Sequence, residues 1–355
     1  MGDNTNHDDR SPLLPDRHPQ QDFFVCDIFD AAPKGDMASM EHPIFSVSTK
    51  PDFNKRAYAH GDAVLRVSPS GNGLATVHDR DVLIYCISQI MAALNDGKPV
   101  SQVVRFKAHD LLIATNRGTD GRGYEQLKAA FKRLQGTQIE TNIITGGQAQ
   151  WDVFSLVDRA SIIRESFDGR MLDVEVKLSD WVFNAIRANE VLTINRDYFR
   201  LRKPLERRIY ELARKHCGAQ KSWKIGLEKL HKKTGSSSTE KEFRRLVRNI
   251  IRQDEQHNHM PDYSIRMDAS DILEFVNRRS DRAGKAGQGR LAFDAAPSPR
   301  QLKPDTFTDA RAAAPGWDVY YLETEWRSWT TEPPRNPDAA FIGFCRQWFE
   351  KRGRP

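Results

Sequence analysis

A row of cations at helical spacing between residues 240 and 252 is the set of side chains best suited to chemistry. The row runs at i, i+4, i+7 and i+11 and consists of Lys241, Arg245, Arg248 and Arg252. Arg244 lies at its edge, and apolar residues repeat on the other side at i, i+3, i+4, i+7 and i+8. A solvated surface helix mixes both signs of charge, because like charges four residues apart repel. The pattern therefore predicts a helix with one face in a core and the other against DNA, where arginine can bind guanine edges as well as phosphates.

A second candidate interface lies in residues 115–136, where Gly118, Gly121 and Gly123 precede a helical pattern. The side chains that we expect to contact DNA here are Tyr124, Gln126, Lys128, Lys132 and Arg133. A nucleotide site would need Gly-x-x-x-x-Gly-Lys-Ser/Thr or Gly-x-Gly-x-x-Gly after a strand, and the stretch has neither. The glycines favour a turn into a helix whose N-terminus faces backbone phosphate, with an ordinary tight turn as the alternative.

Evidence for catalysis or metal binding is thin. His257 and His259 flank Asn258, but no third ligand lies nearby, and a nicking enzyme would require a hydrophobic residue between the histidines. No Walker, Ser-His-Asp or paired-carboxylate pattern stands out. We therefore predict no catalytic residues, no metal site and no cofactor. The wide spacing of the cysteines indicates reduced, buried thiols at Cys26, Cys86, Cys217 and Cys345.

The distribution of charge also indicates a polyanionic partner. The chain of 355 residues carries a net charge of +6. Residues 203–252 hold fifteen Lys and Arg against five Asp and Glu, which leaves the remainder at −4. No run approaches the roughly 18 apolar residues of a membrane span, and the acidic start is unlike a secretory signal, so we expect a cytoplasmic protein with no membrane partner.

The elements that position the first candidate interface follow from hydrophobic periodicity. Helices are predicted over 76–97, with Asp79 as its cap, over 106–118 and over 123–136. The period then changes to two in hairpins over 137–157 and 161–179, which turn at Gly146-Gly147 and Asp168-Gly169. Three helices and a hairpin are the layout of a winged helix-turn-helix, with the Gly146-Gly147 hairpin as the wing.

The same order of elements recurs around the basic row. The predicted helices cover residues 203–218, 225–235 and 238–253, and the strands cover 262–268 and 272–278. We therefore expect an α+β fold with two tandem winged helix-turn-helix domains. The predicted parts are a mostly disordered tail over 1–50, a first domain over 51–180, a second over 181–277, a flexible linker over 278–315 and a small helical C-terminal element over 316–355.

Several of these stretches, taken in order, resemble a known family. The stretches are "HDRDVLIYCISQI", "GRGYEQLKAAFKRLQGTQIETNI", "LSDWVFNAIRANEVLTINRDYFRLRKPLERRIYELARKHCG" and "LEKLHKKTGSSSTEKEFRRLVRNII". Together they resemble the replication initiator protein A family of bacterial plasmids over roughly residues 50–275, and the tail "GWDVYYLETEWRSW" does so more loosely.

The resemblance implies a function that composition alone does not give. Such initiators bind repeated sites in double-stranded origin DNA, help to open an adjacent AT-rich segment and recruit the host initiator or helicase, without nuclease or ATPase activity of their own. Residues 123–135 and 240–252 would be the recognition helices, reaching major grooves about 34 Å apart. A homodimer is one oligomeric state that the sequence leaves open. A transcriptional repressor built from the same modules, and a nicking rolling-circle initiator enzyme, are the alternative functions.

Overall fold

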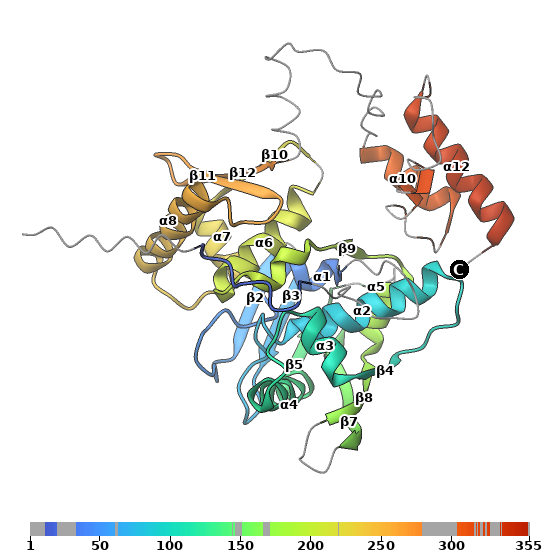
Figure 1. The fold of residues 1–355 in the computed structure, drawn as a ribbon. Helices are drawn as coiled ribbons and strands as arrows, with labels where there is room; N and C mark the ends of the chain where they lie inside the picture. The colour runs from blue at the N-terminus through green and yellow to red at the C-terminus, as the bar shows by residue number, and fades with distance from the viewer. Residues whose placement is uncertain are drawn as a thin grey trace, which may run out of the picture.

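The computed structural model mixes helices and strands throughout, in agreement with the predicted class (Figure 1). It describes residues 11–19, 33–60, 63–143, 145, 151–165, 171–218, 220–278, 304–315, 317, 319, 322–323, 325–326, 334 and 336–353. Within these ranges, no helix has the length and apolarity required to cross a membrane.

The first unit covers residues 80–178. Apart from a hairpin over residues 138–155, which is described below, its elements come in the order helix, strand, helix, helix, strand, strand. Its elements are α2 (Arg80–Asn95), β4 (Val103–Lys107), α3 (Ala108–Ala114), α4 (Gly121–Gly136), β7 (Val157–Glu165) and β8 (Met171–Leu178). The strands form an antiparallel sheet in the order β4-β8-β7, with Phe106 opposite Val174. Alternate residues of β8, namely Val174, Val176 and Leu178, are buried, as expected of a sheet with one face in a core.

A second unit, residues 204–277, repeats this order of elements. It consists of α6 (Pro204–His216), β10 (Ser222–Gly226), α7 (Leu227–Thr234), α8 (Glu240–His257), β11 (Tyr263–Met267) and β12 (Ile272–Asn277). The sheet order is β10-β12-β11, so in both units the last strand lies between the other two. Ile225 lies opposite Leu273, and Ile265 opposite Phe275, which places four apolar side chains on the buried face.

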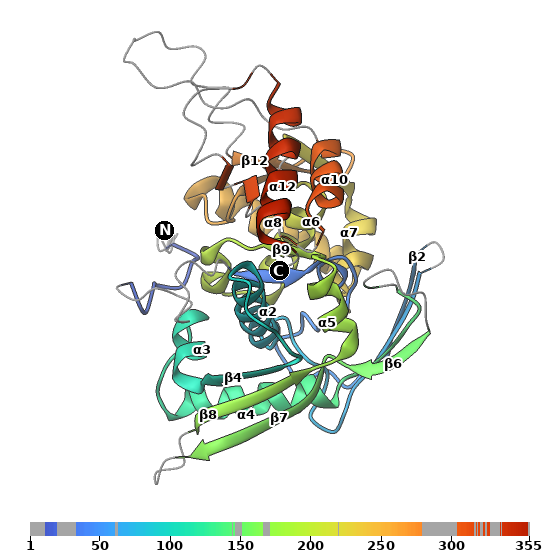
Figure 2. The ribbon, with the colours of Figure 1, turned by 90° about the vertical axis from the view of Figure 1, so that its right-hand side faces the viewer.

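The hairpin predicted as the wing belongs to a different sheet. β5 (Gln138–Thr141) and β6 (Asp152–Ser155) do pair, but β5 also pairs with β3 (Ala63–Ser68), giving the order β2-β3-β5-β6 with β2 (Arg56–His60). The cause is a long-range match of apolar strands, in which Val67 of β3 lies opposite Ile139. The second predicted hairpin, β7–β8, instead packs along α4 (Figure 2). Both predicted turns, 146–147 and 168–169, lie outside the described residues.

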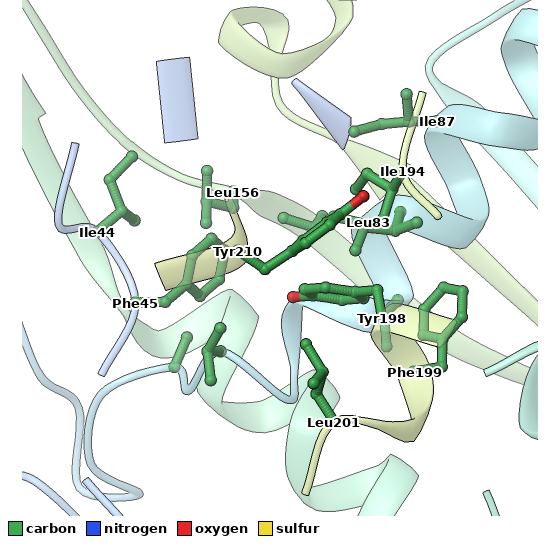
Figure 3. Close-up of a cluster of buried hydrophobic side chains, with 14 of the residues drawn as sticks. Ile44, Phe45, Leu83, Ile87, Leu156, Ile194, Tyr198, Phe199, Leu201 and Tyr210 are labelled. Atoms are coloured by element: carbon green, nitrogen blue, oxygen red, sulfur yellow. The ribbon is translucent and has the colours of Figure 1, made fainter. Parts of the chain in front are cut away.

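One continuous core joins the two units. Figure 3 shows Tyr198 and Tyr210 among side chains from α2, such as Leu83, and from the N-terminal region, such as Phe45. The connecting elements are α5 (Asp180–Arg187), β9 (Val191–Thr193), η1 (Arg196–Arg200), β1 (Lys34–Asp36), which pairs with β9, and α1 (Met37–Glu41), which packs on α6. The predicted tail over 1–50 is therefore wrong for residues 33–50, because α1 and the buried Ile44 and Phe45 belong to the core.

The C-terminal helices form a separate apolar cluster. α10 (Pro304–Ala313) packs against α12 (Pro337–Arg352), and Trp317, Trp326 and Phe341 are buried within this cluster. Regular structure thus resumes at Pro304, inside the stretch predicted as a linker. Asn189 Nδ2 donates a hydrogen bond to the Trp317 carbonyl at 2.9 Å and so connects this cluster to the larger core.

Candidate nucleic-acid interface

Helix α8 has the two faces that its sequence predicts. Thr239 caps its first turn by accepting a hydrogen bond from the Glu242 N–H at 3.3 Å, and Asn258 ends it in the left-handed conformation. The buried face, which packs on β11, consists of Phe243, Val247, Ile250 and Ile251. Exposed on the other side are Lys241, Arg245, Arg248 and Arg252. The helix therefore presents a row of cations to solvent from a well-anchored base.

Acidic side chains hold two of the α8 arginines in place. Arg245 makes two hydrogen bonds to Glu242, at 2.8 and 2.6 Å, and these raise the pKa of Arg245. Arg244 bonds to Glu240 at 2.8 Å and to Asp271 at 2.8 Å. All of these groups are at the surface, where ion pairs add little stability but do limit side-chain movement. The pairs thus orient the guanidinium groups more than they stabilise the fold.

A shallow depression lies along the exposed side of α8. Its volume is about 500 Å³, and it is lined by Thr239, Lys241, Glu242, Arg244, Arg245, Arg248 and Asn249. Within the described part of the chain, Lys241 and Arg248 make no ion pair. The Arg252 guanidinium donates to Asn249 Oδ1 at 2.9 Å. Arginines held by acids thus stand beside cations that form no ion pair with a described residue. This arrangement suits polyanion binding, because phosphate needs only positive charge whereas base edges need fixed donors.

Gly123, in the first turn of α4, has a packing explanation. A Cβ atom at Gly123 would lie 1.9 Å from the Gly118 carbonyl oxygen, so no other residue fits there. Asp120 caps the helix by accepting a hydrogen bond from the Gly123 N–H at 3.0 Å. The structure therefore favours a tight turn as the reason for Gly123, whereas a side chain at Gly121 would meet nothing within 4 Å.

Two of the predicted α4 contacts are buried or ion-paired with a buried acid. Tyr124 is only 7% exposed. Arg133 makes a two-point ion pair with Asp79, with Nε–Oδ2 and Nη2–Oδ1 distances of 2.7 Å, and this hydrogen bonding raises the pKa of Arg133. Asp79 itself was predicted to cap α2 but makes no such bond, since its carboxylate accepts from Arg133 and from the Thr76 N–H. We therefore leave Tyr124 and Arg133 out of the interface.

The remaining α4 contacts lie at the surface. Gln126 and Lys132 are exposed, and Lys128 is partly exposed with its Nζ 3.6 Å from Glu125. Sequence reasoning missed Arg122, which is exposed in the first turn of α4. A cation there opposes the helix dipole, and that unfavourable placement is the signal that could have identified it.

A buried ionic network fixes the two units against each other. Glu211 of α6 pairs with Arg80 of α2 at 2.7 Å and with Arg208 at 3.1 Å, and Tyr198 donates a hydrogen bond to it at 2.6 Å. Burial alone would raise the pKa of Glu211, but the two arginines outweigh it and the pKa is lowered. The local +10 of the sequence stays almost entirely at the surface, because the buried Arg207, Arg208 and Lys233 are nearly balanced by the buried Glu206 and Glu211.

The histidine pair does not form a metal site in this structure. His259 is buried, with its ring nitrogens 3.4 Å from Glu206 and 3.7 Å from Asp254, whereas His257 is partly exposed. Among the described residues, no group of three or more His, Cys, Asp or Glu is arranged to hold a metal ion. Cys86, Cys217 and Cys345 are buried free thiols, as predicted, and burial raises the pKa of Cys217 to about 11. Cys26 lies outside the described residues.

Comparison with known proteins gives the family. The family model "Replication initiator protein A" matches residues 34–265. A protein of Wigglesworthia glossinidia brevipalpis named "Putative replication protein" is 36% identical over 278 residues, which are 77% of this chain and 99% of that protein. Two crystal structures of RctB domains 2 and 3 align with TM-scores of 0.46 at 13% and 11% identity, covering 68% and 70% of this chain and 98% of each RctB chain. The chain therefore belongs to the replication initiator protein A family.

Proposed function

We propose that this protein is a plasmid replication initiator that binds double-stranded origin DNA sequence-specifically. In this proposal the two units are winged-helix modules, α4 and α8 are their recognition helices, and β7–β8 and β11–β12 are the hairpins in the wing position. Support comes from the repeated element order, the shared strand order and the family membership.

The observation that carries the proposal is the exposed face of α8. It is the third helix of its unit, and it combines two held arginines, Arg244 and Arg245, with cations that no described residue pairs, Lys241 and Arg248. Lys132, Gln126 and Arg122 on α4 form a second, weaker contact. About 6 to 10 neutralised phosphates in total would make log K fall steeply with log salt, at about 0.9 per contact.

Opening of an AT-rich segment and recruitment of host replication proteins complete the proposed activity. The larger core already buries the apolar faces of both units, so host proteins would dock on surfaces other than the recognition helices. In this proposal the protein is cytoplasmic and associated with the plasmid, and it has no nuclease or ATPase activity. Its partners are origin DNA and host replication proteins.

Footprinting of the protein on its own plasmid's origin at about 150 mM salt tests the proposal, because weak non-specific binding is largely suppressed there. Wild type should protect repeated sites, and Arg245→Ala/Arg248→Ala should lose that protection. A matched control is Arg66→Ala/Arg105→Ala, which removes two exposed arginines from strands β3 and β4 and should keep the footprint. Protected repeats that Arg245→Ala/Arg248→Ala keeps would refute recognition through α8, and uniform coating of the DNA by wild type would refute origin recognition altogether.

A further inference from the structure

The turn between β11 and β12 carries two carboxylates and no cation. Its four residues run from Asp268 to Asp271. A hairpin tip that binds backbone phosphate does so through Lys, Arg or backbone N–H groups. Carboxylates at that position repel phosphate, so a role other than phosphate contact must account for them.

Hydrogen bonds fix the shape of this turn. Asp268 Oδ1 accepts from the backbone N–H groups of Ser270 at 2.8 Å and Ile272 at 3.0 Å. Asp271 lies in the left-handed region, with φ of 57°, and its carbonyl oxygen accepts from the Leu227 N–H at 2.9 Å, at the start of α7. The carboxylate of Asp271 therefore extends from a backbone position that both the turn and α7 hold.

That carboxylate contacts Arg244 of α8. The Arg244 Nη2 donates to Asp271 Oδ2 at 2.8 Å, and Nε lies 3.3 and 3.2 Å from the two Asp271 oxygens. Glu240 takes a second bond from Nη2 at 2.8 Å. No described residue accepts a hydrogen bond from Nη1, so its two N–H groups remain for an acceptor outside the protein.

We infer that Asp271 is a positioning residue for DNA recognition, which sets the direction of the Arg244 guanidinium and masks its charge from phosphates. This inference rests on the proposed function. Two carboxylates offset the charge of Arg244, so it contributes little to sequence-independent attraction, while its Nη1 donors keep a fixed direction suited to a base edge. The neighbouring Lys241 makes no ion pair with a described residue, and Arg248 lies near enough to Asp271 to lower its pKa but donates no hydrogen bond to it, so both cations supply the undirected attraction.

The test measures affinity for an origin site and for a non-specific duplex of equal length at several salt concentrations. Asp271→Asn keeps the backbone, because asparagine also tolerates positive φ, but removes the charge. We expect it to bind the non-specific duplex several-fold more tightly, with a salt slope steeper by up to about 0.9, and to lose about tenfold in the ratio of specific to non-specific affinity. Glu274→Gln is the matched control: it removes one negative charge from the same hairpin without touching Arg244, and should keep the wild-type ratio.

Combining Asp271→Asn with Arg244→Ala distinguishes a positioning role of Asp271 from a role in the stability of the fold. Arg244→Ala should lower the ratio by itself, and Asp271→Asn should lower it no further in that background. A ratio for Asp271→Asn equal to that of wild type, or a parallel loss of both affinities together with a lower melting temperature, would overturn the inference while leaving the proposed function intact. Failure of wild type to distinguish the origin from other DNA would instead overturn the proposed function, and the inference with it.

Discussion

The two units share an order of elements but use their charged residues differently. In the first unit, Arg133 on the third helix is ion-paired with the buried Asp79, and the exposed cations of that helix are Arg122 and Lys132. In the second unit, Arg244 and Arg245 stay at the surface, where acids of the same unit hold them. The hairpins differ as well: β7 and β8 have 9 and 8 residues, whereas β11 and β12 have 5 and 6. A common fold therefore does not imply that equivalent helices contact a ligand in the same way, because the neighbours of each cation decide whether it is available.

The largest expected effect comes from removing the charge that joins the units. Glu211→Ala leaves the buried Arg208 without its carboxylate and Arg80 with only Asp36 at 3.8 Å, which should lower the free energy of unfolding by about 3–5 kcal/mol. Urea unfolding followed by circular dichroism measures this loss. Glu228→Ala, which breaks the exposed pair with Lys232, is the control and should leave the midpoint unchanged. Equal midpoints for both variants would mean that the network does not hold the units together.

Two adjacent cations of α4 should differ in the effect of their removal, and only one of them should affect stability, by less than Glu211 does. Arg133→Ala removes the two-point partner of Asp79, whose side chain is 3% exposed, and should cost about 1–3 kcal/mol of stability without changing the salt dependence of DNA binding. Lys132→Ala should leave the stability unchanged and reduce the salt dependence of DNA binding. If Arg133→Ala changed the salt slope and not the stability, then α4 would contact DNA through a face other than the one inferred.

Lowering the pH should destabilise the fold where the second unit packs against the N-terminal region. Burial lowers the pKa of His42 to about 4, and burial together with Lys233 lowers the pKa of His216 to about 4. Both histidines are neutral when folded and take up protons more readily when unfolded, so the stability they contribute is complete above pH 6.5 and declines as the pH falls towards 4. Urea midpoints between pH 7 and 4.5 test this. The His42→Gln/His216→Gln variant should show a flatter dependence, and a flat wild-type curve would contradict the assignment.

The smallest effects concern single phosphate contacts in the first unit. Lys132→Ala and Arg122→Ala should each reduce the slope of log K against log salt by about 0.9. Lys128→Ala should change it less, since Glu125 already lies 3.6 Å from that ammonium group. Fluorescence anisotropy at four salt concentrations gives these slopes. An unchanged slope for all three variants would restrict DNA contact to the second unit.

Periodicity in the sequence predicts the elements well and their surroundings less well. The two faces of α8 follow from spacing alone, because each residue's face depends only on its position along the helix. The position of the β5–β6 hairpin does not follow from spacing, because β5 pairs with the distant β3. Arg66 of β3 and Glu140 of β5, for example, form an ion pair although they are 74 residues apart in the sequence. Similarly, helical spacing places Lys132 and Arg133 on different faces, but only the structure shows that Arg133 is ion-paired with the distant Asp79.

The continuous core between the units limits how such a protein can be altered. Tyr198 and Tyr210 lie among side chains from both halves, so neither half can bury its apolar surface alone. Separately expressed halves should aggregate, and a chimera that exchanges one unit with that of a relative must also exchange its share of this boundary. If the proposed function holds, DNA specificity is inherited as a pair of units, and we expect recombination between them to give chains that do not fold.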